Sequence, residues 1–239
     1  MTLRILVISA ILAVPASMQA QGNAVPAPRL GVGLSFSRPL TQYEAQQLGF
    51  NDTSVAVVNG VLPGGAAERA GVLVEDGIVM IDGKPVASPA ALSAAIEGSQ
   101  VGSTVTLQVR RKSETFQIRL QVALTNWPEP KIVRGIVDAS TPQDDPGLTG
   151  FGIFFEPVAE GTAKGVAVRH VSPQGVAART GMITGDIVFK VGGVDVNGAV
   201  QVVDLLKAVK AGESARIVFR RHYADGSSGT RLVFLRRQL

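Results

Sequence analysis

The feature that most constrains this chain is an internal repeat. The segment Val61–Gly71 (VLPGGAAERAG) recurs 110 residues later as Val171–Gly181 (VSPQGVAARTG). The same offset aligns Asp76 with Asp186 and continues to the arginine doublets 110–111 and 220–221. A constant offset over about fifty positions indicates duplication of one folding unit, because unrelated segments do not keep glycine, proline and apolar residues in step.

Each copy combines short strands with short helices. In the first copy we expect strands at 31–36, 54–61 and 77–81, a hairpin over 104–121, helices at 41–48 and 89–96, and a helical turn at 66–70. In the second we expect strands at 152–155, 165–171, 187–191, 215–221 and 232–235, and a helix at 199–209. This mixture predicts an α+β fold in which each copy, of about 90 residues, is a partly open β-barrel with two helices.

The repeat divides the chain into four parts: residues 1–20 as a signal peptide, 29–124 as a first domain, 125–147 as a proline-rich linker and 148–239 as a second domain. The leader has a basic start and an apolar run from Ile5 to Val14, which is too short to span a bilayer. Cleavage after Ala16, cleavage after Ala20 and retention as an anchor remain open. We expect export to the periplasm or cell envelope of a bacterium.

Composition excludes several kinds of chemistry. The chain has no cysteine, which removes disulfides, thiol nucleophiles and thiolate metal sites. Its net charge of +4 is modest, and the doublets 110–111, 220–221 and 236–237 are either solvated arginines or a patch for phosphate, lipid headgroup or acidic protein. We expect no nucleic-acid partner, and the composition gives no support for contact with a membrane surface.

The repeated phrase resembles a known family. Leu62–Gly71, followed by Asp76 and by Asp82–Val86 (DGKPV), is similar to the PDZ domains of bacterial envelope proteases of the HtrA family, and Val171–Val196 repeats the pattern. The first copy departs from it at Glu75, where the second copy has the family's glycine, Gly185. The resemblance implies that an extended peptide adds a strand to an exposed sheet edge and that backbone N–H groups of a glycine-containing loop capture its terminal carboxylate.

The resemblance also assigns the binding residues. It implies carboxylate loops at 29–32 and 150–153, in which Gly31 and Gly152 allow the N–H groups to converge. The implied pocket is lined by Leu30, Val32, Phe151 and Ile153 from the loops and by Ser93, Ile96, Val203 and Leu206 from the facing helices. The alternative is that the loop residues merely begin strands and that the helical residues belong to the core.

No pattern of an active site accompanies these features. Only 28 residues precede Arg29, so we expect no protease domain ahead of the repeats. His170 and His222 lie near no Gly-x-Ser-x-Gly sequence, and the chain has no His-Glu-x-x-His motif. We therefore expect a protein that is not an enzyme, without metal or cofactor.

These observations predict an exported adaptor that binds protein C-termini or extended peptides by strand addition. The alternative is a regulatory subunit that acts in trans on a separate envelope protease or secretion complex. The sequence names neither the ligand nor the oligomeric state.

Overall fold

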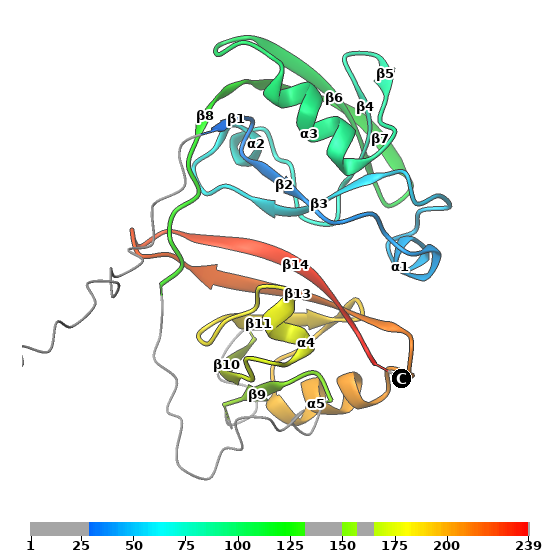
Figure 1. Cartoon of the computed structure of the whole chain (residues 1–239), viewed down its shortest axis with the longest axis vertical. Coiled ribbons are helices and arrows are strands. Elements are labelled where there is room, and N and C mark those ends of the chain that lie inside the picture. The colour runs from blue at the N-terminus through cyan, green and yellow to red at the C-terminus, as the bar shows by residue number, and fades with distance from the viewer. Residues whose placement is uncertain (1–28, 132–149, 157–164, 239) are drawn as a thin grey trace, which may run out of the picture.

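The computed structural model describes residues 29–131, 150–156 and 165–238, and these residues form two similar units (Figure 1). The expected signal peptide and most of the expected linker lie outside this range. The first unit occupies the upper half of Figure 1 and the second the lower half, with strands β13 and β14 along their boundary.

The first unit contains three helices and a small extra sheet. Its elements are β1 (Arg29–Gly31), β2 (Leu34–Phe36), α1 (Gln42–Gln47), β3 (Ala56–Val61), α2 (Ala66–Arg69), β4 (Gly77–Ile81), β5 (Lys84–Pro85), α3 (Pro89–Glu97), β6 (Thr104–Arg111), β7 (Glu114–Gln121) and β8 (Ala123–Thr125). The main strands follow the order β7-β6-β4-β3, β2 pairs with β3, and β1 pairs with β8.

The second unit repeats this order without the extra sheet in its described part. Its elements are β9 (Ile153–Phe155), β10 (Val166–Val171), α4 (Val176–Arg179), β11 (Ile187–Val191), β12 (Val194–Asp195), α5 (Ala199–Lys207), β13 (Ser214–His222) and β14 (Ser228–Arg236). The strands follow the order β14-β13-β11-β10-β9. The sheet stays unclosed in both units, as expected, and the first unit has three helices because the expected helical turn at 66–70 forms the short helix α2.

Local sequence explains where the helices begin. Thr41 and Glu44 form a capping box at α1: Thr41 Oγ1 accepts from Glu44 N–H at 3.3 Å, and the Glu44 carboxylate accepts from Thr41 N–H at 2.9 Å. Helix α3 begins at Pro89, whose missing N–H costs nothing in the first turn, and the Ser88 hydroxyl accepts from Ala91 N–H.

An aspartate–arginine pair occupies the same place in each unit. Asp76 accepts from Arg111 Nε and Nη2 and from Leu73 N–H. Asp186 accepts in the same way from Arg221 Nε and Nη2 and from Ile183 N–H. Both carboxylates are buried, so these two doublet arginines are structural residues of the repeat rather than parts of a surface patch.

The two units share a hydrophobic cluster. Besides one core in each unit, a third cluster joins the α1 region to the second unit's sheet; its buried members are Leu40, Ala45, Leu48, Phe50, Val55, Val57, Val218, Leu232 and Phe234. At the same boundary, Gly60 of β3 pairs with Arg231 of β14, which links the two sheets. Helix α1, which has no counterpart in the described part of the second unit, therefore serves the contact between the units.

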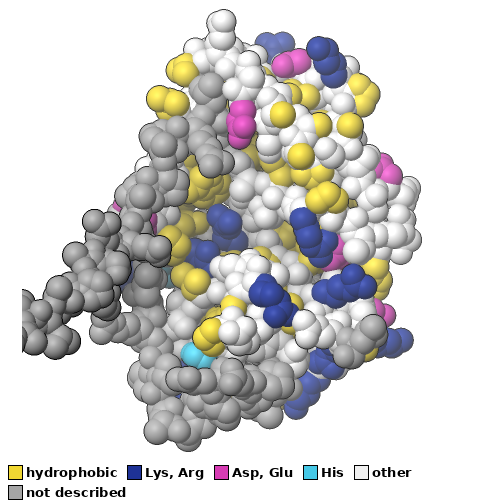
Figure 2. Space-filling view, viewed as in Figure 1, with side chains coloured by type: hydrophobic (Ala, Val, Ile, Leu, Met, Phe, Trp, Pro, Cys, Tyr) yellow, Lys and Arg dark blue, Asp and Glu magenta, His cyan; other side chains and the backbone are white. Residues whose placement is uncertain are grey.

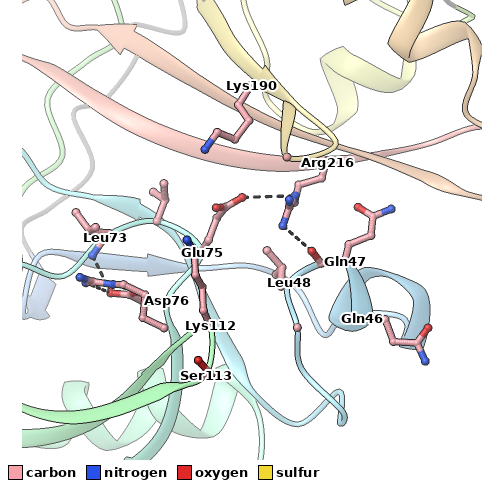
Figure 3. A pocket seen from close by; sticks show the side chains of 14 residues that line it. Gln46, Gln47, Leu48, Leu73, Glu75, Asp76, Lys112, Ser113, Lys190 and Arg216 are labelled. Carbon is pink, nitrogen blue, oxygen red and sulfur yellow. Dashed lines mark hydrogen bonds and ion pairs between the residues drawn. The ribbon is translucent and has the colours of Figure 1, made fainter. Parts of the chain in front are cut away.

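A polar cavity of about 890 Å³ lies beside this cluster (Figure 3). Arg216 of the second unit donates to Gln47 C=O at 2.7 Å and lies 3.5 Å from the Glu75 carboxylate. Glu75 has a φ of +75° at the position where the second unit has Gly185. The departure from the repeat at Glu75 thus places a carboxylate against the neighbouring unit.

Candidate functional site

The loop before β2 is held by its own carbonyl groups. Val32 C=O accepts from Ala67 N–H at 3.1 Å, and Gly33 C=O accepts from Leu62 N–H at 2.8 Å. Both bonds anchor the loop to the segment around α2. Among the residues that the structure describes, none accepts a hydrogen bond from the N–H groups of Val32 and Gly33.

The loop before β9 has the same hydrogen bonds. Phe151 C=O accepts from Ala177 N–H at 3.1 Å, and Gly152 C=O accepts from Ser172 N–H at 2.8 Å. The two loops are therefore structural counterparts, residue by residue.

This correspondence corrects the alignment that the sequence suggested. Gly33, and not Gly31, is the counterpart of Gly152; their φ angles are +79° and +73°. Gly31 ends β1, where it pairs with Ala123. The apolar residue that follows the loop glycine in the first unit is accordingly Leu34, which the sequence-based assignment missed.

Steric space explains why both positions are glycine. A Cβ added at Gly152 would lie 2.8 Å from Gly175 Cα, and one added at Gly33 would lie 3.3 Å from Leu62 Cβ. Both residues also adopt the left-handed conformation that penalises side chains. Glycine is thus required for the loop geometry itself.

Strand register directs the backbone N–H and C=O groups of the residue after each glycine away from the partner strand. Leu34 lies opposite Val61, and the bond from Leu62 N–H to Gly33 C=O makes Leu34–Val61 a non-hydrogen-bonded pair. In such a pair the N–H and C=O groups point away from the partner strand. Ile153, opposite Val171, has the same arrangement. We call these sides of β2 and β9 the outer edges.

Each outer edge is open within the described structure. Strand β2 pairs only with β3 and strand β9 only with β10 in the part of the chain that is described. A further strand can therefore bond to Leu34 or Ile153 while its end reaches the glycine loop.

The predicted pocket residues divide into buried and accessible ones. Burial is nearly complete for Val32, Ile96, Phe151, Ile153 and Leu206, which belong to the cores of their units. Ser93 on α3 and Val203 on α5 are half-buried and lie outside these clusters. Leu30 lies in β1, where its backbone pairs with Leu124.

Partly exposed apolar side chains also lie on β2 and β9, the strands that carry the outer edges. Leu34 and Phe36 of β2 pack against the first core, and Phe155 of β9 packs against the second. The sequence-based assignment missed Phe36 and Phe155, although their spacing of two from Leu34 and Ile153 places each pair on one face of a strand. The alternation of apolar residues was the signal that could have identified them.

The two loops differ in charge. The Arg237 guanidinium lies 5.3 Å from the Phe151 ring centroid, donates to Leu206 C=O, and would lie 3.5 Å from a Cβ on Gly150. Matching backbone bonds place Val122 at the equivalent position of the first unit. The second loop therefore has a cation beside it where the first has an apolar side chain.

The two histidines lie in different surroundings. His170 pairs with Phe154 across β10 and β9, and their tilted rings have centroids 5.5 Å apart. His222 is exposed, and its backbone carbonyl accepts from Lys131 N–H. In the described ranges, no cluster of three or more His, Asp or Glu residues could hold a metal ion. No helix there is long and apolar enough to cross a membrane.

Open strand edges and glycine loops recur in the same arrangement in both units, so the two units are copies of one type of domain. The PDZ-domain family matches residues 28–122 and, through a second family description, residues 168–221. The chain contains two PDZ domains and is homologous to HtrA-type proteases of the DegP group over the part of those proteins that contains their PDZ domains.

Two curated relatives illustrate this homology. A probable periplasmic serine endoprotease of Rhizobium meliloti, described as DegP-like, is 26% identical over 193 residues, which cover 80% of this chain and 38% of the relative. The periplasmic serine endoprotease DegP of Salmonella typhimurium is 31% identical over 134 residues, covering 56% and 26%. The chain thus spans well under half the length of these relatives.

Among solved structures, the HtrA-type protease AlgW with a decapeptide is similar to this chain. It has 27% sequence identity and a TM-score of 0.38, and the match covers 42% of this chain and 31% of that one.

Proposed function

We propose that this chain is a non-catalytic, exported adaptor that captures C-terminal or extended segments of other proteins in its PDZ grooves. The observation that carries the proposal is the repeated outer edge: Leu34 and Ile153 each direct backbone N–H and C=O groups away from the sheet, next to a glycine loop. An added peptide strand gains main-chain hydrogen bonds there, and its carboxylate meets backbone N–H groups.

The grooves also suit an apolar last residue. Leu34 and Phe36 in the first domain, and Phe155 in the second, offer partly exposed apolar surface over a closed core. The proposed site keeps the predicted residues Leu30, Val32, Ser93 and Ile96 of the first domain and Phe151, Gly152, Ile153, Val203 and Leu206 of the second. Gly33 replaces Gly31 as the loop glycine of the first domain, and Leu34, Phe36 and Phe155 are added.

Calorimetric titration with C-terminal peptides tests the proposal. The best free-acid decapeptide from a display library is titrated into the purified chain and compared with the same peptide carrying a C-terminal amide. We expect micromolar binding that the amide abolishes. Binding that is indifferent to amidation, or weaker than about millimolar for every peptide, contradicts the proposal.

Glycine variants assign the binding to a groove. Gly33→Ala and Gly152→Ala strain the two loops, whereas Gly49→Ala and Gly226→Ala place the same strain at positive φ where nothing lies within 4 Å of the new Cβ. We expect loss of binding only for the loop variants. A stoichiometric protein complex that survives both loop variants supports the regulatory subunit instead.

Export is proposed from the leader sequence and from the periplasmic relatives. Fractionation of cells that produce the whole chain, followed by intact mass measurement, tests it. A periplasmic product that begins at Ser17 or Gln21 supports cleavage, and an uncleaved cytoplasmic product contradicts export.

A further inference from the structure

A pocket of about 490 Å³ is lined by four arginines from both domains. Arg38 comes from the segment before α1, Arg179 from α4, and Arg236 and Arg237 from the end of β14. We call it the arginine pocket. In Figure 2, Lys and Arg side chains gather on the flank of the molecule where α1, α4 and the C-terminus lie in Figure 1.

Among the described residues that line this pocket, none carries a carboxylate. Arg38 forms an ion pair with Glu44, its Nη2 lying 2.6 Å from the Glu44 carboxylate. Arg179 donates through Nη1 to Gln174 C=O, which leaves its charge uncompensated, and Arg236 is exposed without a hydrogen bond or ion pair to any described residue. Arg179 and Arg236 therefore bring to the pocket positive charge and N–H donors that no described carboxylate pairs with.

Three arginines of the other two doublets are engaged within the protein. Arg111 and Arg221 pair with buried aspartates, and the Arg110 guanidinium lies 4.7 Å from the Phe50 ring centroid. In the doublet 236–237, by contrast, both arginines line the arginine pocket.

We infer that the arginine pocket binds a phosphate group. Guanidinium groups match phosphate through paired N–H donors, and one phosphate offers nearly two negative charges and three acceptor oxygens to the several arginines, whereas a carboxylate offers one charge. The pocket has room for a phosphate ester. Such a group is supplied either by a soluble phosphate compound or by a lipid headgroup.

Calorimetry with pyrophosphate and cosedimentation with vesicles test the inference. The vesicles contain either phosphatidic acid, whose headgroup is a phosphate monoester, with phosphatidylcholine, or phosphatidylcholine alone. We expect Arg179→Gln and Arg236→Gln each to weaken binding about tenfold, the loss of one charge-assisted contact. Arg119→Gln, which removes an exposed arginine of β7 outside the pocket, is the matched control and is expected to bind as the parent does.

The outcomes separate the two sources. Pyrophosphate binding that needs Arg179 and Arg236 supports a soluble phosphate ligand, and vesicle binding with the same dependence, but no pyrophosphate binding, supports a lipid headgroup. Equal weakening by Arg119→Gln indicates attraction by net charge alone and overturns the inference, as does the absence of binding to both probes. Circular dichroism of each variant verifies that the fold is retained.

Discussion

The two aspartate–arginine pairs provide a comparison within one molecule. In each, the carboxylate accepts from arginine Nε and Nη2 at distances between 2.6 and 2.8 Å and from a backbone N–H at 2.9 Å. The pairs differ in the exposure of the arginine side chain, which is 34% for Arg111 and 9% for Arg221. Solvent screening is therefore the main variable between them.

We predict that replacing the aspartate by asparagine lowers the free energy of unfolding by different amounts in the two domains. Asp186→Asn leaves the Arg221 guanidinium buried without its counter-ion, and breaking a buried pair in this way costs about 3–5 kcal/mol. Asp76→Asn leaves Arg111 able to recover water, so the loss is limited to about 1–2 kcal/mol. The free energy of unfolding should fall further for Asp186→Asn although the hydrogen bonds lost are the same.

Urea denaturation followed by circular dichroism measures this difference. Asp204→Asn is the matched control, because this aspartate is exposed on α5 and the same charge is removed. We expect the control to stay within about 0.5 kcal/mol of the parent. Equal costs for Asp76→Asn and Asp186→Asn, or a larger cost for Asp76→Asn, would refute the reasoning from solvent screening.

Three further predictions concern single residues. Burial alone raises the pKa of the Glu44 carboxyl, but hydrogen bonds from Arg38 and Thr41 outweigh it and lower the pKa below 4.5. The stabilisation is complete above that value and is lost as pH falls through the lower folded pKa, so Glu44→Gln should flatten the acid limb of a stability–pH curve; an unchanged limb counts against this. Glu75→Gly should change stability by less than about 1 kcal/mol, because relief of left-handed strain offsets a partly exposed ion pair; a larger loss in urea midpoint would assign a major role to that pair. Arg237→Val, which copies the first domain, should weaken peptide binding in the second groove and reduce its preference for a free carboxylate over an amide in calorimetry; unchanged preference would show that the loop amides act alone.

Several elements follow directly from the sequence. Strands β4 and β11 have the bounds that the repeat predicted, and β6 and β7 span the expected hairpin 104–121. Local patterns determine such elements, and β11 and β13 follow β4 and β6 at the offset of 110 residues.

The loop register could not be read in the same way. Leu30-Gly31-Val32 and Val32-Gly33-Leu34 are both a glycine between apolar residues, and only the hydrogen bonds to Leu62 and Ala67 distinguish them. The expected single strand 31–36 is also interrupted, because Gly33 adopts a positive φ. These features depend on contacts between segments about thirty residues apart, which local patterns do not encode.

The packing of the two domains was equally hidden from the sequence. Leu40, Leu48 and Phe50 are typical apolar residues of a short helix and its ends, and nothing in their pattern indicates that they cover Leu232 and Phe234 of the other domain. Burial against a partner surface is decided by the tertiary fold.

The link between Gly60 and Arg231, reinforced by the shared cluster, fixes the distance between the two outer edges at which we propose that peptides bind. A polypeptide with two recognition segments can engage both at once only when the chain between them spans that distance, and its avidity then depends on the length of that spacer. The proposed function then implies that the protein selects its polypeptide ligands by the spacing between their two recognition segments as well as by the sequence of each segment.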